Sequence, residues 1–298
     1  MDTQLLAAFI AVAGAASFSQ AAEQLHLTQP AISKRIAQLE QLLGARLFDR
    51  IGRRVSLTES GARLLPRAQR ILREIEETTR AIRDLSGQVS GRLSLATSHH
   101  IGLHRLPPVL RAFSQRHPEV NLEIEFMDSE KAHAAVAQGV IEFAVITLAP
   151  EGSAPRLEAR EIWPDPLSVM VASDHPLAAR NHVSIEILSG YPAVLPGVST
   201  YTGQILQQQF QACGARLQIS MSTNYLETLR MLVAIGLGWS VLPDSMLTGE
   251  LVALELEETR MQRSLGYVYH RDRTLSNAAQ AFLALLDGAA QRSSSPLQ

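Results

Sequence analysis

The sequence is poor in the features that mark secreted, membrane-bound and redox-switched proteins. It has one cysteine, Cys213, which excludes an internal disulfide and a switch built from two thiols. No apolar run reaches the length needed to cross a membrane, and the first residues lack the basic segment of a signal peptide. We therefore expect a cytoplasmic protein that is not attached to a membrane.

Signatures of common catalytic sites are also missing. The sequence has no Ser–His–Asp spacing, no glycine-rich phosphate loop and no paired carboxylates at the end of an expected strand. An enzyme that uses histidines for acid–base chemistry stays open as an alternative. Our expectation is that the chain has no catalytic residues.

Charge is unevenly distributed along the chain, although the net charge is only −2. Residues 1–73 contain ten Lys/Arg and five Asp/Glu, a net charge of +5. Residues 92–298 contain 15 Lys/Arg and 20 Asp/Glu, a net charge of −5. A basic head on an acidic body is typical of a module that binds a polyanion and is joined to a domain with another task.

Residues 18–50 predict two short amphipathic helices joined by a tight turn, a helix-turn-helix. The second helix begins with Thr28, a residue type suited to capping, and Pro30 lies in its first turn, where a missing N–H is tolerated. Its polar face suits the major groove of DNA, because it offers amide, hydroxyl and cationic donors. That face consists of Gln29, Ser33, Lys34 and Gln38.

The segment LFDRIGRRVSLT (47–58) predicts two short extended pieces around Gly52, a hairpin that we call the wing. Arg50, Arg53 and Arg54 cluster on it. In an isolated hairpin, a solvated charged turn and a DNA contact would be equally good interpretations of this cluster. Beside a helix that reads DNA, contact with phosphates or the minor groove is favoured.

A long helix is predicted from Thr58 to about Leu85. Its apolar positions alternate in spacings of four and three residues, which is the pattern of a coiled-coil seam. We expect this helix to pair two heads on an inverted repeat; the alternative is a helix packed on its own domain. The expected dimer contacts are Leu64, Ala68, Ile71, Ile75 and Ile82, and the linker SGQVSG (86–91) follows.

From Gly91 onward, strand and helix patterns alternate, as expected for a mostly parallel sheet with helices on both faces. The strand VNLEIEFM (120–127) should turn Val120, Leu122, Ile124 and Phe126 inward. A proline-rich corner, WPDP (163–166), separates two blocks of this pattern.

AAEQLHLTQPAISKRIAQLEQLLGARLFDR (21–50), followed by VSLTESG (55–61), resembles the N-terminal signature of LysR-type transcriptional regulators, and the match is dense over residues 3–65. The resemblance implies an α+β protein with a winged helix-turn-helix, a long linker helix and a two-subdomain α/β effector domain like the type 2 periplasmic binding proteins. The corresponding ranges are 1–58, 59–90 and 91–298, with subdomain I at about 91–163 plus 267–298 and subdomain II at about 164–266.

The resemblance also implies roles and partners. Gln29, Pro30, Ser33 and Lys34 would meet base edges and the wing arginines the DNA backbone. The partners would be double-stranded promoter DNA, a small-molecule effector and further copies of the chain, as dimers that assemble into tetramers and bend the DNA. RNA polymerase is a candidate partner, and no cofactor is expected. The lone Cys213 departs from the peroxide-sensing members, which use paired cysteines.

The effector would bind in the cleft between the subdomains, at the carboxyl ends of strands. Two expected helix starts carry clustered polar residues, and there free N–H groups favour an anion. For each residue, capping of the chain's own helix is the alternative role. The expected effector contacts are Ser98, His99, His100, Thr147, Ser199, Thr200 and Asn224, which together indicate a small carboxylate or other polar anion.

A metal site is the less favoured interpretation of the histidines. His100 and His104 are four residues apart, but no cysteine or carboxylate within residues 91–111 supplies a third ligand. We expect no metal.

Two alternative functions stay open. One is a DNA-binding protein of nucleoid type without an effector, although the large α/β body argues against it. The other is a different metabolite-responsive family with a similar head.

Overall fold

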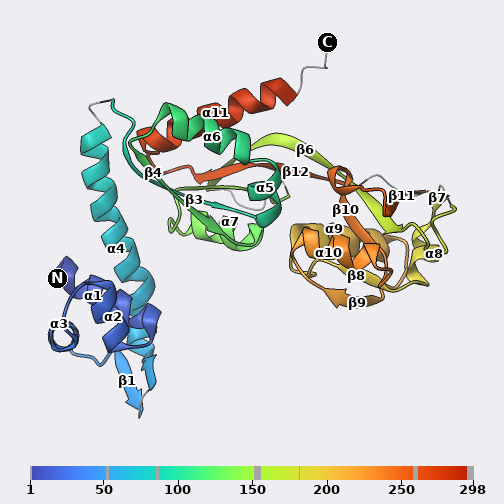
Figure 1. Ribbon diagram of the computed structural model, residues 1–298. Coiled ribbons are helices and arrows are strands. Elements are labelled where there is room, and N and C mark those ends of the chain that lie inside the picture. Colours follow the sequence, from blue (N-terminus) through green and yellow to red (C-terminus); the bar gives the residue numbers. More distant parts are fainter. Residues whose placement is uncertain are drawn as a thin grey trace. The chain divides into compact units, whose positions relative to one another are not determined.

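The computed structural model describes residues 2–51, 54–84, 87–150, 156–180, 182–257 and 261–293 (Figure 1). It divides into two compact units, Met1–Ser86 and Gly87–Gln298, which we call the head and the body. Among the described residues, no helix combines the length and the apolar character that a membrane crossing requires.

The head packs α1 (Thr3–Ala15), α2 (Phe18–Gln24) and α3 (Gln29–Leu43) around one apolar core. Asp2 caps α1 and Ser17 caps α2 with their side chains. Thr28 occupies the N-cap position of α3 but makes no side-chain capping bond, so that part of the expected helix start is not formed. The helix-turn-helix itself is present.

The wing consists of β1 (Phe48–Ile51) and β2 (Arg54–Leu57), which pair antiparallel. Phe48 fixes it to the helices, because its ring lies 5.3 Å from Phe9 and 5.9 Å from Phe18 between centroids. Thr58 then joins the wing to the next helix: its Oγ1 donates to Arg46 O at 2.7 Å and accepts from Gly61 N at 3.1 Å.

Helix α4 (Glu59–Asp84) uses the predicted seam in two different ways. Ala68 is fully buried in the core of the head, and Leu64 and Ile71 pack against that core. Ile75 and Ile82 are 44% and 66% exposed. The first half of the predicted dimer seam therefore serves the head's own core, and only its second half presents apolar side chains to solvent.

The body contains a mixed sheet in the order β4-β3-β5-β12-β6-β11-β7, with β10 also paired to β6, and a separate parallel pair, β8-β9. Among the strand pairs of the described residues in the body, β3–β4, β3–β5, β7–β11 and β8–β9 are parallel and the pairs of β6 and of β12 are antiparallel. The expectation of a mostly parallel sheet is thus wrong, while the α/β class is confirmed. The strands are β3 (Gly91–Thr97), β4 (Val120–Phe126), β5 (Phe143–Thr147), β6 (Leu157–Ala172), β7 (His182–Val183), β8 (Ala193–Leu195), β9 (Ile219–Ser222), β10 (Ser240–Pro243), β11 (Leu251–Leu256) and β12 (Met261–His270).

Helices cover both ends of this sheet. In Figure 1, α6 and α11 lie on one face of β3–β5 and α7 on the other. We call β3–β5 with α5–α7 and α11 subdomain I, and β7–β11 with α8–α10 subdomain II. The helices are α5 (His99–His104), α6 (Pro107–Arg116), α7 (Ser129–Ala137), α8 (Ile185–Ser189), α9 (Tyr201–Ala212), α10 (Leu226–Ala234), the short 3-10 helix Asp244–Met246, and α11 (Asn277–Ser293).

The long antiparallel strands β6 and β12 run from one subdomain into the other (Figure 1). The WPDP segment lies inside β6 and is not a corner. Its prolines are tolerated because β12 is the partner along residues 164–166, and β10 begins to pair only at Leu167. Gly266 lies at a bulge in β12, where a Cβ would come within 2.0 Å of Arg160 O.

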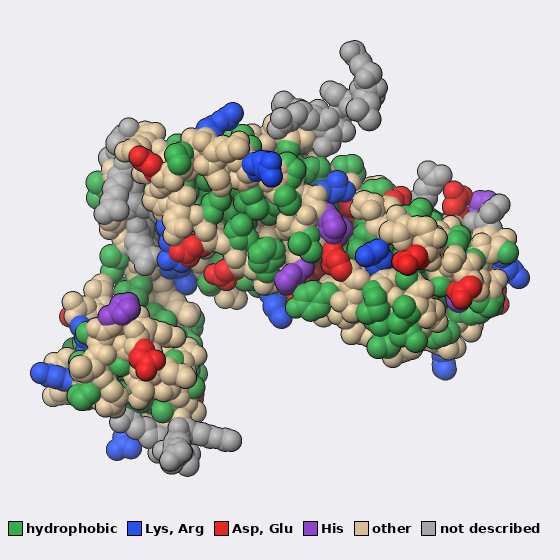
Figure 2. All heavy atoms as spheres, in the orientation of Figure 1, with side chains coloured by type: hydrophobic (Ala, Val, Ile, Leu, Met, Phe, Trp, Pro, Cys, Tyr) green, Lys and Arg blue, Asp and Glu red, His purple; other side chains and the backbone are tan. Residues whose placement is uncertain are grey.

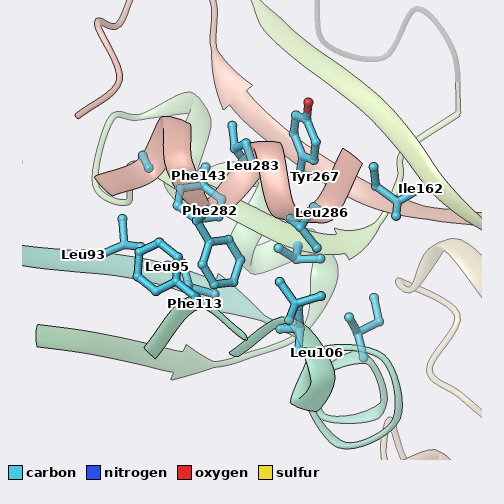
Figure 3. Packing of buried hydrophobic residues seen from close by; sticks show 14 of the residues in the cluster. Leu93, Leu95, Leu106, Phe113, Phe143, Ile162, Tyr267, Phe282, Leu283 and Leu286 are labelled. Atoms are coloured by element: carbon cyan, nitrogen blue, oxygen red, sulfur yellow. The ribbon is translucent and has the colours of Figure 1, made fainter. Parts of the chain in front are cut away.

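Strand β5 explains why subdomain I is a three-layer structure. Phe143 and Val145 belong to one apolar cluster, and Ala144 and Ile146 to the cluster on the opposite face. Figure 3 shows the first cluster, in which Phe282 of α11 lies between Phe113 of α6 and Phe143. In β4 the pattern is weaker: Phe126, expected inward, is 49% exposed and faces the ring of His99 instead.

Candidate functional site

The predicted DNA-reading face of α3 is accessible. Gln29, Pro30, Lys34 and Gln38 are exposed and Ser33 is half-buried, whereas Ile32, Ile36 and Leu39 are fully buried on the opposite face. Gln29 Nε2 donates to Ser33 Oγ at 3.0 Å, so one turn holds an amide and a hydroxyl side by side. This arrangement offers donors and acceptors to base edges.

The wing arginines are only partly described. Arg50 lies on β1 and Arg54 begins β2, where the backbone is described but the side chains are not. Arg53 lies outside the described residues. Their predicted contact with the DNA backbone stays a prediction.

The body contains a cavity of about 60 Å³ between its two subdomains. Six of the seven predicted effector contacts line it, and Ser199 does not. They follow strands that end at the same place: Ser98 follows β3, Thr147 ends β5, and Asn224 follows β9. This is the position where α/β folds bind ligands. The lining residues that carry polar atoms are Ser98, His99, His100, Asp128, Ser129, Glu130, Thr147, Thr200, Tyr201, Thr202, Asn224, Tyr225 and Arg263.

The two predicted helix starts differ in how their hydroxyls are used. Thr200 caps α9: its Oγ1 accepts from Gly203 N at 3.0 Å and donates to Gly197 O at 2.7 Å. Ser98 stands at the N-cap position of α5 without a side-chain capping bond. The hydroxyl of Thr200 therefore serves the chain, whereas that of Ser98 is available to a ligand.

A carboxylate of the chain already lies at the start of α9. Glu130, from α7 in subdomain I, accepts a hydrogen bond of 2.6 Å from the backbone N–H of Tyr201 in subdomain II. Burial, and then the negative charge of Glu130, raise the pKa of the Tyr201 phenol. The N-terminus of α9 thus binds an anion in this structure, and the anion comes from the opposite wall of the cavity.

Arg263 is the cation of the cavity wall. Its Nε donates to Asp165 Oδ2 at 2.7 Å and its Nη1 to Thr202 Oγ1 at 3.1 Å. Asp165 is only 1% exposed, and Arg105 approaches its other oxygen at 3.4 Å. Two guanidinium groups around one carboxylate leave a net positive charge at this end of the cavity, which favours an anionic ligand.

Two histidines and a carboxylate meet beside the cavity. His104 Nε2 lies 2.9 Å from Glu227 Oε1, and His100 Nδ1 lies 3.6 Å from the same oxygen. Burial, assisted by the charge of Arg263, lowers the pKa of His100 to about 4, so its imidazole is neutral at pH 7. Burial works against the ionisation of Glu227, but hydrogen bonds from its own backbone and from His104 outweigh this and lower its pKa.

The fold brings a third ligand-type side chain to the histidines from outside residues 91–111, so the lack of one within that segment does not exclude a metal site. Glu227 comes from α10, more than a hundred residues further along the chain, and it supplies the third ligand-type atom beside His100 and His104. The sequence around the histidines does not predict their contact with Glu227.

Sequence reasoning also missed Glu130, Arg263 and Tyr225 as residues of the cavity. Glu130 lies in the first turn of a helix after β4, and a search of every strand end for charged residues finds it. Arg263 lies within β12, and nothing in the sequence around it predicts that this strand lines the cavity. Tyr225, whose ring lies 4.8 Å from that of His99, follows the predicted Asn224 directly.

Family models match nearly the whole chain. The model described as "Bacterial regulatory helix-turn-helix protein, lysR family" matches residues 3–62. The model described as "LysR substrate binding domain" matches residues 86–291.

Three relatives are similar in sequence. A transcriptional regulator from the ibpB-leuC intergenic region of Azotobacter vinelandii, itself uncharacterized, is 69% identical over 108 residues, which are 36% of this chain and 75% of the relative. The uncharacterized regulator YbhD of Escherichia coli is 30% identical over 285 residues, 94% of this chain and 89% of the relative. The RuBisCO operon transcriptional regulator of Allochromatium vinosum is 30% identical over 282 residues, which are 93% of this chain and 92% of the relative.

Solved structures share the fold. Full-length CbnR in complex with its target DNA gives a TM-score of 0.69 at 23% identity, covering 99% of this chain and 100% of that one. The regulatory domain of Synechocystis CcmR with 2-PG gives 0.61 at 22% identity, covering 68% and 98%. The effector-binding domain of QuiR with shikimate gives 0.61 at 16% identity, also covering 68% and 98%.

Proposed function

Because the chain belongs to the LysR family of transcriptional regulators, we propose that it reads a specific promoter sequence and that a small carboxylate or similar polar anion controls it. Gln29, Pro30, Ser33, Lys34 and Gln38 contact bases, and Arg50, Arg53 and Arg54 contact the DNA backbone. The anion binds in the cavity of the body. Promoter DNA, the effector and further copies of the chain are the partners.

One observation carries the effector proposal: a carboxylate is already held in the cavity. Glu130 accepts from the N-terminus of α9 at 2.6 Å, which supports an anion site there. Ser98 and Arg263 add a hydroxyl and a guanidinium from the other walls. In the related fold of QuiR and of the CcmR regulatory domain, the bound molecules are shikimate and 2-PG.

The size of the cavity restricts the effector. A single ordered water needs about 10–15 Å³ of such volume, and the cavity offers about 60 Å³. A ligand of a few non-hydrogen atoms fits without rearrangement. A larger one requires the two subdomains to separate, as Glu130 leaves α9.

Dimers form through the exposed second half of α4, around Ile75 and Ile82, and assemble further into tetramers that bend the DNA. The effector acts on this assembly only if it binds one placement of the heads more tightly than another, because a ligand of equal affinity shifts no equilibrium.

The test is a thermal-shift screen of the full chain against small mono- and dicarboxylates, followed by DNase footprints with and without each stabilising compound. We expect at least one compound to raise the melting temperature and change the footprint. Ser98→Ala should weaken its binding, and Ser199→Ala, also a serine before a helix but outside the cavity, should not. No stabilisation across the panel, with unchanged footprints, would instead favour a nucleoid-type DNA-binding protein without an effector.

A further inference from the structure

We propose that His100, His104 and Glu227 form a binding site for a divalent transition-metal ion of the Zn²⁺ class, which ties α5 of subdomain I to α10 of subdomain II. This site shares His100 with the lining of the effector cavity and goes beyond the proposed function. Binding of the metal ion requires no metabolite, so it can be tested independently of the proposed carboxylate effector.

The spacing of the ligand atoms suits a metal ion. Around a tetrahedral Zn²⁺ with bonds of about 2.0–2.2 Å, ligand atoms lie about 3.3–3.6 Å apart. Glu227 Oε1 lies 2.9 Å from His104 Nε2 and 3.6 Å from His100 Nδ1, and one ligand atom from each of the three residues falls within 4.8 Å of the others. Shifts of a few tenths of an ångström to about one ångström complete the geometry.

His100 supplies an independent reason to expect a ligand. Its side chain is only 5% exposed, and neither ring nitrogen has a hydrogen-bond partner in the described part of the chain. A buried polar group without a partner costs free energy. A metal ion coordinated by Nδ1 removes that cost for one of the two ring nitrogens.

The fold presents the two imidazoles together. His100 and His104 are four residues apart on α5, so they share one face, and their ring centroids are 4.8 Å apart. His104 and Glu227 are 49% and 33% exposed, which gives an ion access from solvent. Figure 2 shows histidine and acidic side chains next to one another on the face in view, where the two subdomains meet.

The donor set also selects the class of ion. Two imidazoles and one carboxylate are the ligands of open zinc sites, in which water or another oxygen ligand completes the coordination. Hard ions such as Mg²⁺ and Ca²⁺ prefer oxygen ligands and are disfavoured here. One carboxylate against a divalent ion leaves a net positive charge between the subdomains.

The test uses the tag-free full chain, stripped with EDTA and titrated with Zn²⁺ by calorimetry and by competition with a chromophoric chelator. We expect one Zn²⁺ per chain. His104→Gln and Glu227→Gln should each weaken binding by more than about 100-fold, since loss of even an outer-sphere partner costs about 10–100-fold. Both side chains are partly exposed, so these variants should fold, which circular dichroism verifies.

Two matched variants control for adventitious binding. His182 and Glu255 form another histidine–carboxylate pair, at 3.5 Å, on the surface of subdomain II; His182→Gln should bind Zn²⁺ like the unaltered chain. Cys213→Ser, which removes the exposed thiol, should also retain binding. The proposal is overturned if no stoichiometric Zn²⁺ binds, if His104→Gln and Glu227→Gln bind like the unaltered chain, or if Cys213→Ser loses the site.

Discussion

Removing one partner of the ion pair between Arg263 and Asp165 should destabilise the body far more than breaking an ion pair of the same length elsewhere on the same strand. Asp165 is 1% exposed and the Arg263 side chain 7%, with Nε and Oδ2 2.7 Å apart. Asp165→Asn keeps the volume and one acceptor oxygen but removes the charge. Because Arg263 then remains buried without its counter-ion, we expect the free energy of unfolding to fall by about 3 kcal/mol, the lower end of the range for broken buried pairs.

Glu158→Gln is the matched comparison. Glu158 lies on β6 as Asp165 does, and its Oε1 is also 2.7 Å from an arginine Nε, that of Arg271. Its side chain and that of Arg271 are 44% and 59% exposed. Water screens such a pair, so we expect a loss of at most about 1 kcal/mol. The distance from the arginine Nε to the carboxylate is the same in the two pairs, whereas burial differs and Asp165 has Arg105 as a second partner at 3.4 Å.

Urea unfolding followed by tryptophan fluorescence measures this difference in the full chain. Both tryptophans of the sequence, Trp163 and Trp239, lie in the body and are buried there, so the signal reports on that unit. Protein concentration is kept equal, since self-association shifts apparent stability. Equal losses for Asp165→Asn and Glu158→Gln would refute the argument that burial determines the contribution of this pair.

Three further predictions concern DNA, assembly and the effector. Ser33→Ala should reduce discrimination between operator and random DNA by about 1–3 kcal/mol per lost base contact, as measured by competition binding; equal weakening on both DNAs would contradict it. Ile75→Glu should weaken dimerisation in sedimentation equilibrium without lowering the head's stability, because this side chain is 44% exposed; an unchanged dimer would exclude the second half of α4 as the interface. Glu130→Gln should strengthen binding of a carboxylate effector. Asp128→Asn removes a charge from the same wall of the cavity, but Asp128 is paired with Lys131, so this variant should change the affinity little. Equal effects of the two variants would show that only net charge matters.

The head could be predicted from its sequence in most respects, because local signals determine it. Helical periodicity, the capping residue Ser17 and the turn before α3 all lie within a few residues of the structure they specify. The failure was in α4. The seam from Leu64 to Ile82 has one continuous pattern, but a pattern of apolar residues does not say whether the facing surface belongs to the same chain or to a partner. Contact with the core of the head decides it for Leu64, Ala68 and Ile71.

The body was predictable in class but not in its sheet. Residues 157–165 were not recognised as part of the strand β6, because the prolines of WPDP suggested a corner. The strands that pair with β6 are far away in the sequence. The residues around WPDP therefore do not show which edge of β6 is unpaired and can accept a proline. The residues of the cavity also differ in how far the sequence predicts them. Ser98 and Thr147 can be predicted because each lies at the end of a strand, whereas the position of Arg263 depends on the pairing of β12 with β6.

Under the proposed function, the contacts between the subdomains suggest how a small ligand would act as a switch in this body. Glu130 crosses from α7 to the start of α9, and Glu227 of α10 meets His104 of α5, so an acid from each subdomain bonds to the other. An effector carboxylate that takes the place of Glu130 at Tyr201 N gains no net hydrogen bond at that point. Its preference for one arrangement must therefore come from groups that lack a committed role, above all the hydroxyl of Ser98, and from release of Glu130 into solvent. We therefore expect the affinity of the effector and the closure of the cleft to be coupled through Glu130, so that changing this residue alters both together.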